Sequence, residues 1–115
     1  MSDQFGFDEY QKLAGKTALY PGRDDEGVAA YPALGLAGEA GEVCEHVKKL
    51  IRDDDGRLTD ERRRRLKKEL GDVLWYVAAL CSELELNMGE VAQANVEKLA
   101  DRQRRDVLHG EGDER

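Results

Sequence analysis

The chain has 115 residues and a net charge of −7, with 37% charged residues and only two prolines. This length suits a single domain, 1–115, which buries roughly two-thirds of its unfolded surface. The negative charge argues against a nucleic-acid backbone or an anionic membrane as partner. The longest apolar run, 73–81, is too short to span a bilayer, and no signal-peptide pattern opens the chain. We therefore expect a cytoplasmic protein that binds neither nucleic acid nor a membrane.

Apolar residues recur at helical spacing along most of the chain. Pro21 and Gly22 end the first helical pattern and lead into a polar connection at 23–27. The second helix starts either near Gly27 or at Pro32, because proline suits a first helical turn. Acidic residues at 53–55 form a turn, without the spacing of a calcium loop. Four helices are expected, at about 8–20, 27–52, 59–86 and 87–105.

Two capping signals mark where the last two helices begin. Thr59 is a suitable N-cap, and Asn87 with Glu90 resembles a capping box. The last segment, 107–115, is polar and contains glycine, so we expect it to be flexible. The ordered core is then about 7–105, and the fold class is an all-α four-helix bundle.

The third helix is apolar on nearly every side between 73 and 81. Trp75 lies opposite the stripe formed by Leu70, Val73 and Val77. A helix that is apolar all round is buried all round. Either the first or fourth helix covers the extra side, or a second subunit does. We expect a subunit interface, giving a homodimer or a dimer-based homo-oligomer.

One acidic pattern occurs twice, beside two matching apolar stripes. Glu39 and Glu42 border the first stripe, and Glu69 and Asp72 take the equivalent positions on the second. Residues three apart share a helical face, so each pair projects together. If the two helices pack antiparallel through their stripes, the four carboxylates meet along one border of the bundle.

Crowded carboxylates repel one another and call for a hard divalent cation. The chain has only two histidines and lacks paired Glu-x-x-His motifs, which argues against a zinc or di-iron centre. Mg²⁺, with Mn²⁺ as a substitute, is the expected cofactor. Magnesium commonly completes its coordination with waters and phosphate oxygens, so a nucleotide polyphosphate is the indicated ligand.

The spacing Glu39-x-x-Glu42 followed by Glu69-x-x-Asp72 resembles the ExxE…ExxD signature of the MazG-like all-α nucleoside triphosphate pyrophosphohydrolases. The likeness extends from about Tyr31 to Arg102. The resemblance implies a dimeric helical bundle that hydrolyses (deoxy)nucleoside triphosphates to nucleoside monophosphate and pyrophosphate. It further implies a role in nucleotide-pool housecleaning.

The resemblance also assigns roles to the acids. Glu39, Glu42, Glu69 and Asp72 would be the catalytic, metal-binding residues, holding Mg²⁺ that activates water for attack on the α-phosphorus. The chain departs from some relatives at Ala40, where those have a further acid beside the first glutamate. Deprotonation of the water then rests either on a ligand such as Glu42 or on the metal alone.

Four further residues are expected to bind the substrate: Tyr76, Asn95, Lys98 and Lys49. Tyr76 follows Asp72 by one turn, so it either lines the nucleotide pocket or simply packs. For Asn95 and Lys98 the resemblance suggests nucleotide or phosphate contacts, the alternative being an internal hydrogen bond and a surface lysine. Lys49 either screens phosphates or remains solvated.

Other residues near this region are expected to have lesser roles. Tyr20, Pro21 and Tyr31 could wall the base. His46 is expected beside the acids and partly exposed, and the arginine run at 62–65 is expected to be a solvated helix face.

Two other functions fit parts of the pattern. A phosphoribosyl-ATP pyrophosphohydrolase-like enzyme would use the same chemistry on a related substrate. A non-catalytic helical dimerisation module would use the apolar third helix without a metal. The phase-matched acids favour the enzyme, because such an arrangement is costly without a cation.

Overall fold

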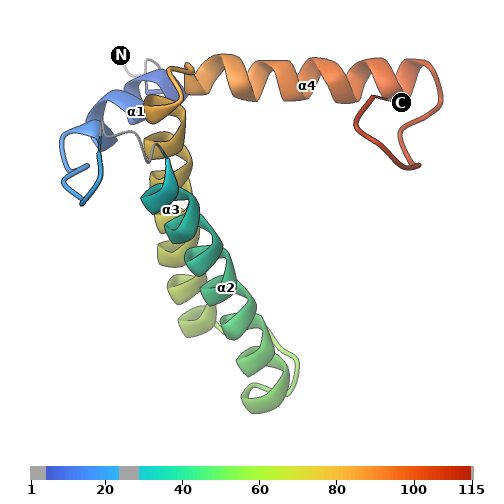
Figure 1. Ribbon diagram of the computed structural model, residues 1–115. Coiled ribbons are helices and arrows are strands. Elements are labelled where there is room, and N and C mark those ends of the chain that lie inside the picture. The colour runs from blue at the N-terminus through green and yellow to red at the C-terminus, as the bar shows by residue number, and fades with distance from the viewer. Residues whose placement is uncertain (1–4, 24–28, 115) are drawn as a thin grey trace.

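The computed structural model describes residues 5–23 and 29–114. Over these residues the chain forms four helices, α1 (Phe7–Gly15), α2 (Ala30–Asp53), α3 (Asp60–Glu83) and α4 (Met88–Arg104), and no strand. The predicted all-α, four-helix class is confirmed. α2 and α3 lie side by side as an antiparallel hairpin, α1 lies across one end of it, and α4 projects sideways from that end (Figure 1). None of these helices is long and apolar enough to cross a membrane.

α1 is shorter than predicted, because it ends at Gly15 and not near Tyr20. Glycine inside a helix costs about 1 kcal/mol relative to alanine. The chain then turns, and the hydroxyl of Thr17 donates to the carbonyl of Ala14 at 3.1 Å and accepts from the indole N–H of Trp75 at 2.9 Å. This hydrogen bond to α3 stabilises the chain in the conformation in which the helix ends early.

α2 begins at Ala30, between the two predicted starts, with Pro32 buried in its first turn. The predicted start near Gly27 and most of the predicted polar connection at 23–27 lie outside the described residues. After α2, the chain reverses through Asp55 and Gly56, both at positive φ (56° and 72°). Glycine adopts such a backbone at little cost, which explains its place in this turn.

Both predicted caps are confirmed. The side chain of Thr59 accepts a hydrogen bond from the backbone N–H of Arg62 at 3.0 Å, and that of Asn87 accepts one from Glu90 at 2.9 Å. α3 stops at Glu83, a little before its predicted end, because the chain turns through Glu85 at a φ of 57°. Capping chemistry is local, so sequence alone places these helix starts.

The core lies where α1, α3 and the start of α4 meet. Its buried members are Ala14, Ala78, Cys81 and Met88. Trp75 packs against this cluster from α3 and faces α1. α1 therefore covers this side of the third helix, which was the alternative to a second subunit.

Two side chains of α1 hold the start of α4. The amide of Gln11 donates to the carbonyl of Leu86 at 2.9 Å and accepts from the N–H of Met88 at 2.8 Å. The carboxylate of Asp8 accepts from the N–H of Gly89 at 3.0 Å. These bonds satisfy backbone groups that a helix N-terminus leaves unpaired, and they join α4 to α1.

The C-terminal segment turns back onto α4. Asp113 pairs with Lys98 at 2.9 Å and with Arg102 at 3.0 Å, and Arg102 is buried. The single-domain limits and the flexibility of 107–115 stay predictions.

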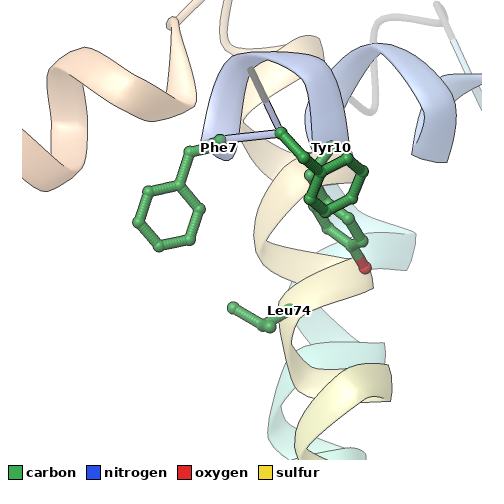
Figure 2. Close-up of a pocket in the computed structure, with 5 residues that line it drawn as sticks. Phe7, Tyr10 and Leu74 are labelled. Carbon is green, nitrogen blue, oxygen red and sulfur yellow. The ribbon is translucent and has the colours of Figure 1, made fainter. Parts of the chain in front are cut away.

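One face of α3 is open and apolar. Leu70, expected in the stripe that faces α2, is 53% exposed. A surface groove of about 660 Å³ follows this face and is lined by Leu58, Arg63, Leu66, Lys67, Leu70, Gly71 and Leu74. Leu74 also borders a second hollow, of about 320 Å³, with Phe7 and Tyr10 of α1 (Figure 2). The two hollows share Leu74.

Candidate metal centre

The α2–α3 hairpin brings three carboxylates together. Glu39 comes from α2, and Glu69 and Asp72 come from one face of α3. One carboxylate oxygen of each lies within 4.8 Å of the others. Glu39 and Glu69 are half-buried and Asp72 is exposed. These three residues are the acid group.

The acid group concentrates negative charge. The pKa of Glu39 is raised, first because burial disfavours its charged form and then because it shares a hydrogen bond with Glu69. The charges of Asp72, Glu69 and Glu42 raise it further. A divalent cation with oxygen ligands would remove this repulsion, so the donor set suits Mg²⁺ or Mn²⁺.

Glu42 lies beside the acid group and not in it. It is exposed, and its charge contributes to the raised pKa of Glu39. The convergence expected from the sequence therefore applies to three of the four acids in the described structure.

Next to the acid group lies a series of polar side chains that contact one another and are shielded from solvent. The sequence analysis did not predict these contacts. His46 Nε2 is 3.7 Å from Glu69 Oε1, and His46 Nδ1 is 3.1 Å from Nη1 of Arg62. Nε of Arg62 donates to Asp54 at 3.0 Å. The side chain of Arg62 is only 11% exposed, so its expected place on a solvated face is wrong. The other three arginines of the run, Arg63, Arg64 and Arg65, are exposed as expected.

Aromatic rings gather one turn away from the acids. Tyr20 and Tyr31 stack with ring centroids 5.0 Å apart, and Trp75 meets the rings of Tyr20 and Tyr76 edge-on. Burial, and then the charges of Tyr31, Glu39 and Asp72, raise the pKa of Tyr76. Tyr76 therefore lies beside both the acid group and the other aromatic rings, as its spacing indicated.

The remaining predicted substrate-binding residues lie elsewhere. Lys49 is on α2, two turns beyond Glu42. Asn95 and Lys98 are on α4, which leads away from the hairpin (Figure 1), and Lys98 is paired with Asp113. Asn95 lines a surface hollow of about 330 Å³ on α4 with Val91, Ala94 and Lys98. Within one chain, the structure does not bring Asn95 and Lys98 to the acid group.

The fold and the acid group define an all-helical protein with a carboxylate site on a helical hairpin. The chain belongs to the MazG nucleotide pyrophosphohydrolase domain family, whose model matches residues 32–106. Membership of this family supports nucleotide pyrophosphohydrolase activity for this chain, which is the hydrolysis of an acid anhydride bond. A relative, the "Gene 37 protein" of Mycobacterium phage L5, is 48% identical over 112 residues, which cover 94% of this chain and 97% of that protein. No solved structure matches the chain.

Proposed function

We propose that this protein is a Mg²⁺-dependent pyrophosphohydrolase that converts (deoxy)nucleoside triphosphates to nucleoside monophosphates and pyrophosphate. The observation that carries this proposal is the convergence of Glu39, Glu69 and Asp72 on the hairpin of a MazG-family chain. A role in clearing unwanted nucleotides from the cellular pool follows from that chemistry as part of the same proposal.

Glu39, Glu69 and Asp72 would hold the metal, with Glu42 beside them as a further ligand or as the base that takes the proton of the attacking water. A bound Mg²⁺ supplies charge neutralisation for the triphosphate and lowers the pKa of a bound water. Burial and crowding with the other carboxylates raise the pKa of Glu39, and a bound cation would relieve that crowding.

The aromatic rings supply a surface for the base. Tyr76 lies beside Glu39 and Asp72, and Tyr31, which is close to Tyr76, is 45% exposed. A base stacked on these rings would leave the triphosphate directed toward Glu39 and toward Asp72, which precedes Tyr76 by one turn of α3. Ring faces stack on any base, so these residues contribute affinity more than base selectivity.

We also propose that the active form is a homodimer or an assembly of dimers. The apolar groove on α3 exposes Leu58 at 48%, Leu70 at 53% and Leu74 at 40%. Contiguous apolar surface of this kind usually marks an interaction site. A second copy of the chain is the partner proposed for it. In such an assembly α4 of one subunit, carrying Asn95 and Lys98, could approach the acids of another.

The products test the proposed reaction. Purified protein is incubated with Mg²⁺, a panel of nucleoside triphosphates and phosphoribosyl-ATP in ¹⁸O-labelled water. Attack on the α-phosphorus predicts label in the monophosphate and release of unlabelled pyrophosphate. Label in orthophosphate would contradict the proposal, and hydrolysis of phosphoribosyl-ATP alone would favour the related enzyme class. Absence of any hydrolysis would favour a non-catalytic dimerisation module.

A further inference from the structure

A chain of polar contacts joins the α2–α3 turn to the acid group. It runs from Asp54 in the turn to Arg62 on α3, then to His46 on α2 and finally to Glu69. The four side chains are between 11% and 21% exposed, whereas Arg63, Arg64 and Arg65 are each more than half exposed. Solvent and salt therefore screen these contacts less than they screen an ion pair on an exposed surface.

The contact between Arg62 and His46 determines which ring nitrogen can carry a proton. Arginine has only donors, so the 3.1 Å contact from its Nη1 requires an acceptor lone pair on Nδ1 of His46. The proton of the neutral ring must then be on Nε2, the nitrogen that faces Glu69.

We infer that Arg62 is a positioning residue that acts through His46 on the metal centre. By fixing the Nε2–H tautomer, Arg62 directs the N–H dipole of His46 at the carboxylate of Glu69. The separation of 3.7 Å exceeds a hydrogen bond, so the effect is an orienting electrostatic one. Arg62 also binds Asp54, and this second bond fixes the guanidinium relative to the turn.

This inference rests on the proposed function, since it requires Glu69 to be a metal ligand. Groups around a metal site orient its ligands, and losing one typically costs 10–100-fold in metal affinity. Without Arg62, the ring of His46 is free to present the Nδ1–H tautomer and a lone pair toward Glu69. We expect the lower end of that range, about tenfold, because His46 does not make a full hydrogen bond to Glu69.

The first test measures metal binding without nucleotide. Mn²⁺ is titrated into metal-free protein and followed by electron paramagnetic resonance. Arg62→Met is expected to bind Mn²⁺ about tenfold more weakly than wild type. The matched control is Arg63→Met, which removes an exposed arginine at the next position of the same helix. Equal Mn²⁺ affinity for Arg62→Met, Arg63→Met and wild type would overturn the inference.

The second test reads the tautomer directly and needs no metal. The chain has two histidines, so a His109→Gln background leaves His46 as the only imidazole. Long-range ¹H–¹⁵N spectra are recorded at about pH 8.5, well above the ordinary histidine pKa. The Nε2–H pattern is expected in this background and a mixture of tautomers after adding Arg62→Met. An Nδ1–H pattern in the background protein would refute the role assigned to Arg62.

Two further variants separate positioning from stability. His46→Gln keeps a donor near Glu69 and should retain most of the Mn²⁺ affinity that His46→Leu loses. Asp54→Asn removes a charge but keeps a side-chain oxygen that can accept from Nε of Arg62, so Arg62 stays facing His46 and the Mn²⁺ affinity should stay near that of wild type. An equal loss in Asp54→Asn and Arg62→Met would assign the effect to the fold and contradict the inference. Wild type that binds no Mn²⁺ would instead refute the proposed function, and this inference with it.

Discussion

The ring of Tyr76 lies against the backbone of Gly35, so close that a Cβ atom at position 35 would be 2.2 Å from Cε1 of the ring. Only glycine leaves room for the ring there. In Gly35→Ala the ring must move, and the base would lose a stacking surface worth about 1–3 kcal/mol. We expect KM to rise at least fivefold, with little change in Mg²⁺ affinity.

Gly38→Ala is the matched control for this prediction. Gly38 is on the same helix, and a Cβ atom there meets nothing within 4 Å. Its alanine variant should have the KM of wild type and slightly higher stability, because alanine favours a helix over glycine. If Gly35→Ala and Gly38→Ala behave alike in steady-state kinetics, Tyr76 does not contact the nucleotide.

Asp72→Asn should separate stability from metal binding. The charge of Asp72 raises the pKa of Glu39, so removing it relieves repulsion in the metal-free protein. The metal-free variant should be at least as stable as metal-free wild type and nearly inactive. Mg²⁺ should raise the Tm of wild type and raise that of the variant much less, because binding stabilises only the native state. Sodium chloride at matched ionic strength controls for screening, and equal Mg²⁺ effects on both proteins would exclude Asp72 as a ligand.

The raised pKa of Glu39 predicts how stability depends on pH without metal. The folded protein holds this proton more tightly than the unfolded chain, so it binds more protons above the ordinary value of 4.5. The free energy of unfolding should therefore fall as pH rises above 4.5 and level off above the folded pKa. Urea unfolding of metal-free protein across this range measures the trend.

Glu39→Gln is the comparison for the pH series, because glutamine cannot titrate. Its free energy of unfolding should lack the decline that wild type shows above pH 4.5. Glu61, whose pKa Arg64 and Arg65 lower to about 2, affects stability only below 4.5, so the two effects occupy separate pH ranges. Parallel curves for wild type and Glu39→Gln above 4.5 would contradict the crowding of the acid group.

The exposed groove of α3 predicts where subunits meet. Leu70→Glu places a charge in the lining of the groove and should convert a dimer to monomers at micromolar concentration, measured by light scattering. Leu19→Glu is the control, since Leu19 is 87% exposed and does not line the groove. Unchanged mass in Leu70→Glu, or a monomeric wild type, would rule out this surface as the interface.

Periodicity and local chemistry made much of the fold predictable. Glu39, Glu69 and Asp72 converge because they occupy matching phases beside two stripes of adjoining helices. Thr59 and Asn87 cap helices with bonds that span three residues, which a sequence reveals directly.

The features that the sequence did not predict depend on individual contacts between different elements of the fold. Arg62 stands in a run of four arginines, and only the position of His46 and Asp54 distinguishes it from its neighbours. The direction of α4 depends on Gln11 and Asp8, which reach residues more than 70 positions away. No periodic pattern records such contacts, so a sequence alone does not place α4.

The bonds from α1 hold α4 at its start, so a small rotation at that point displaces the far end of α4 by a larger distance. A Cβ atom at Gly89 would lie 2.7 Å from Oδ1 of Asp8, so a side chain there would push the Asp8 carboxylate out of its present position. α4 has 17 residues and is therefore about 25 Å long. A rotation of about 10° at the joint would displace its far end by about 4 Å over that length. The position of the far end of α4 thus depends on two side chains of α1, a nine-residue helix that holds the start of α4.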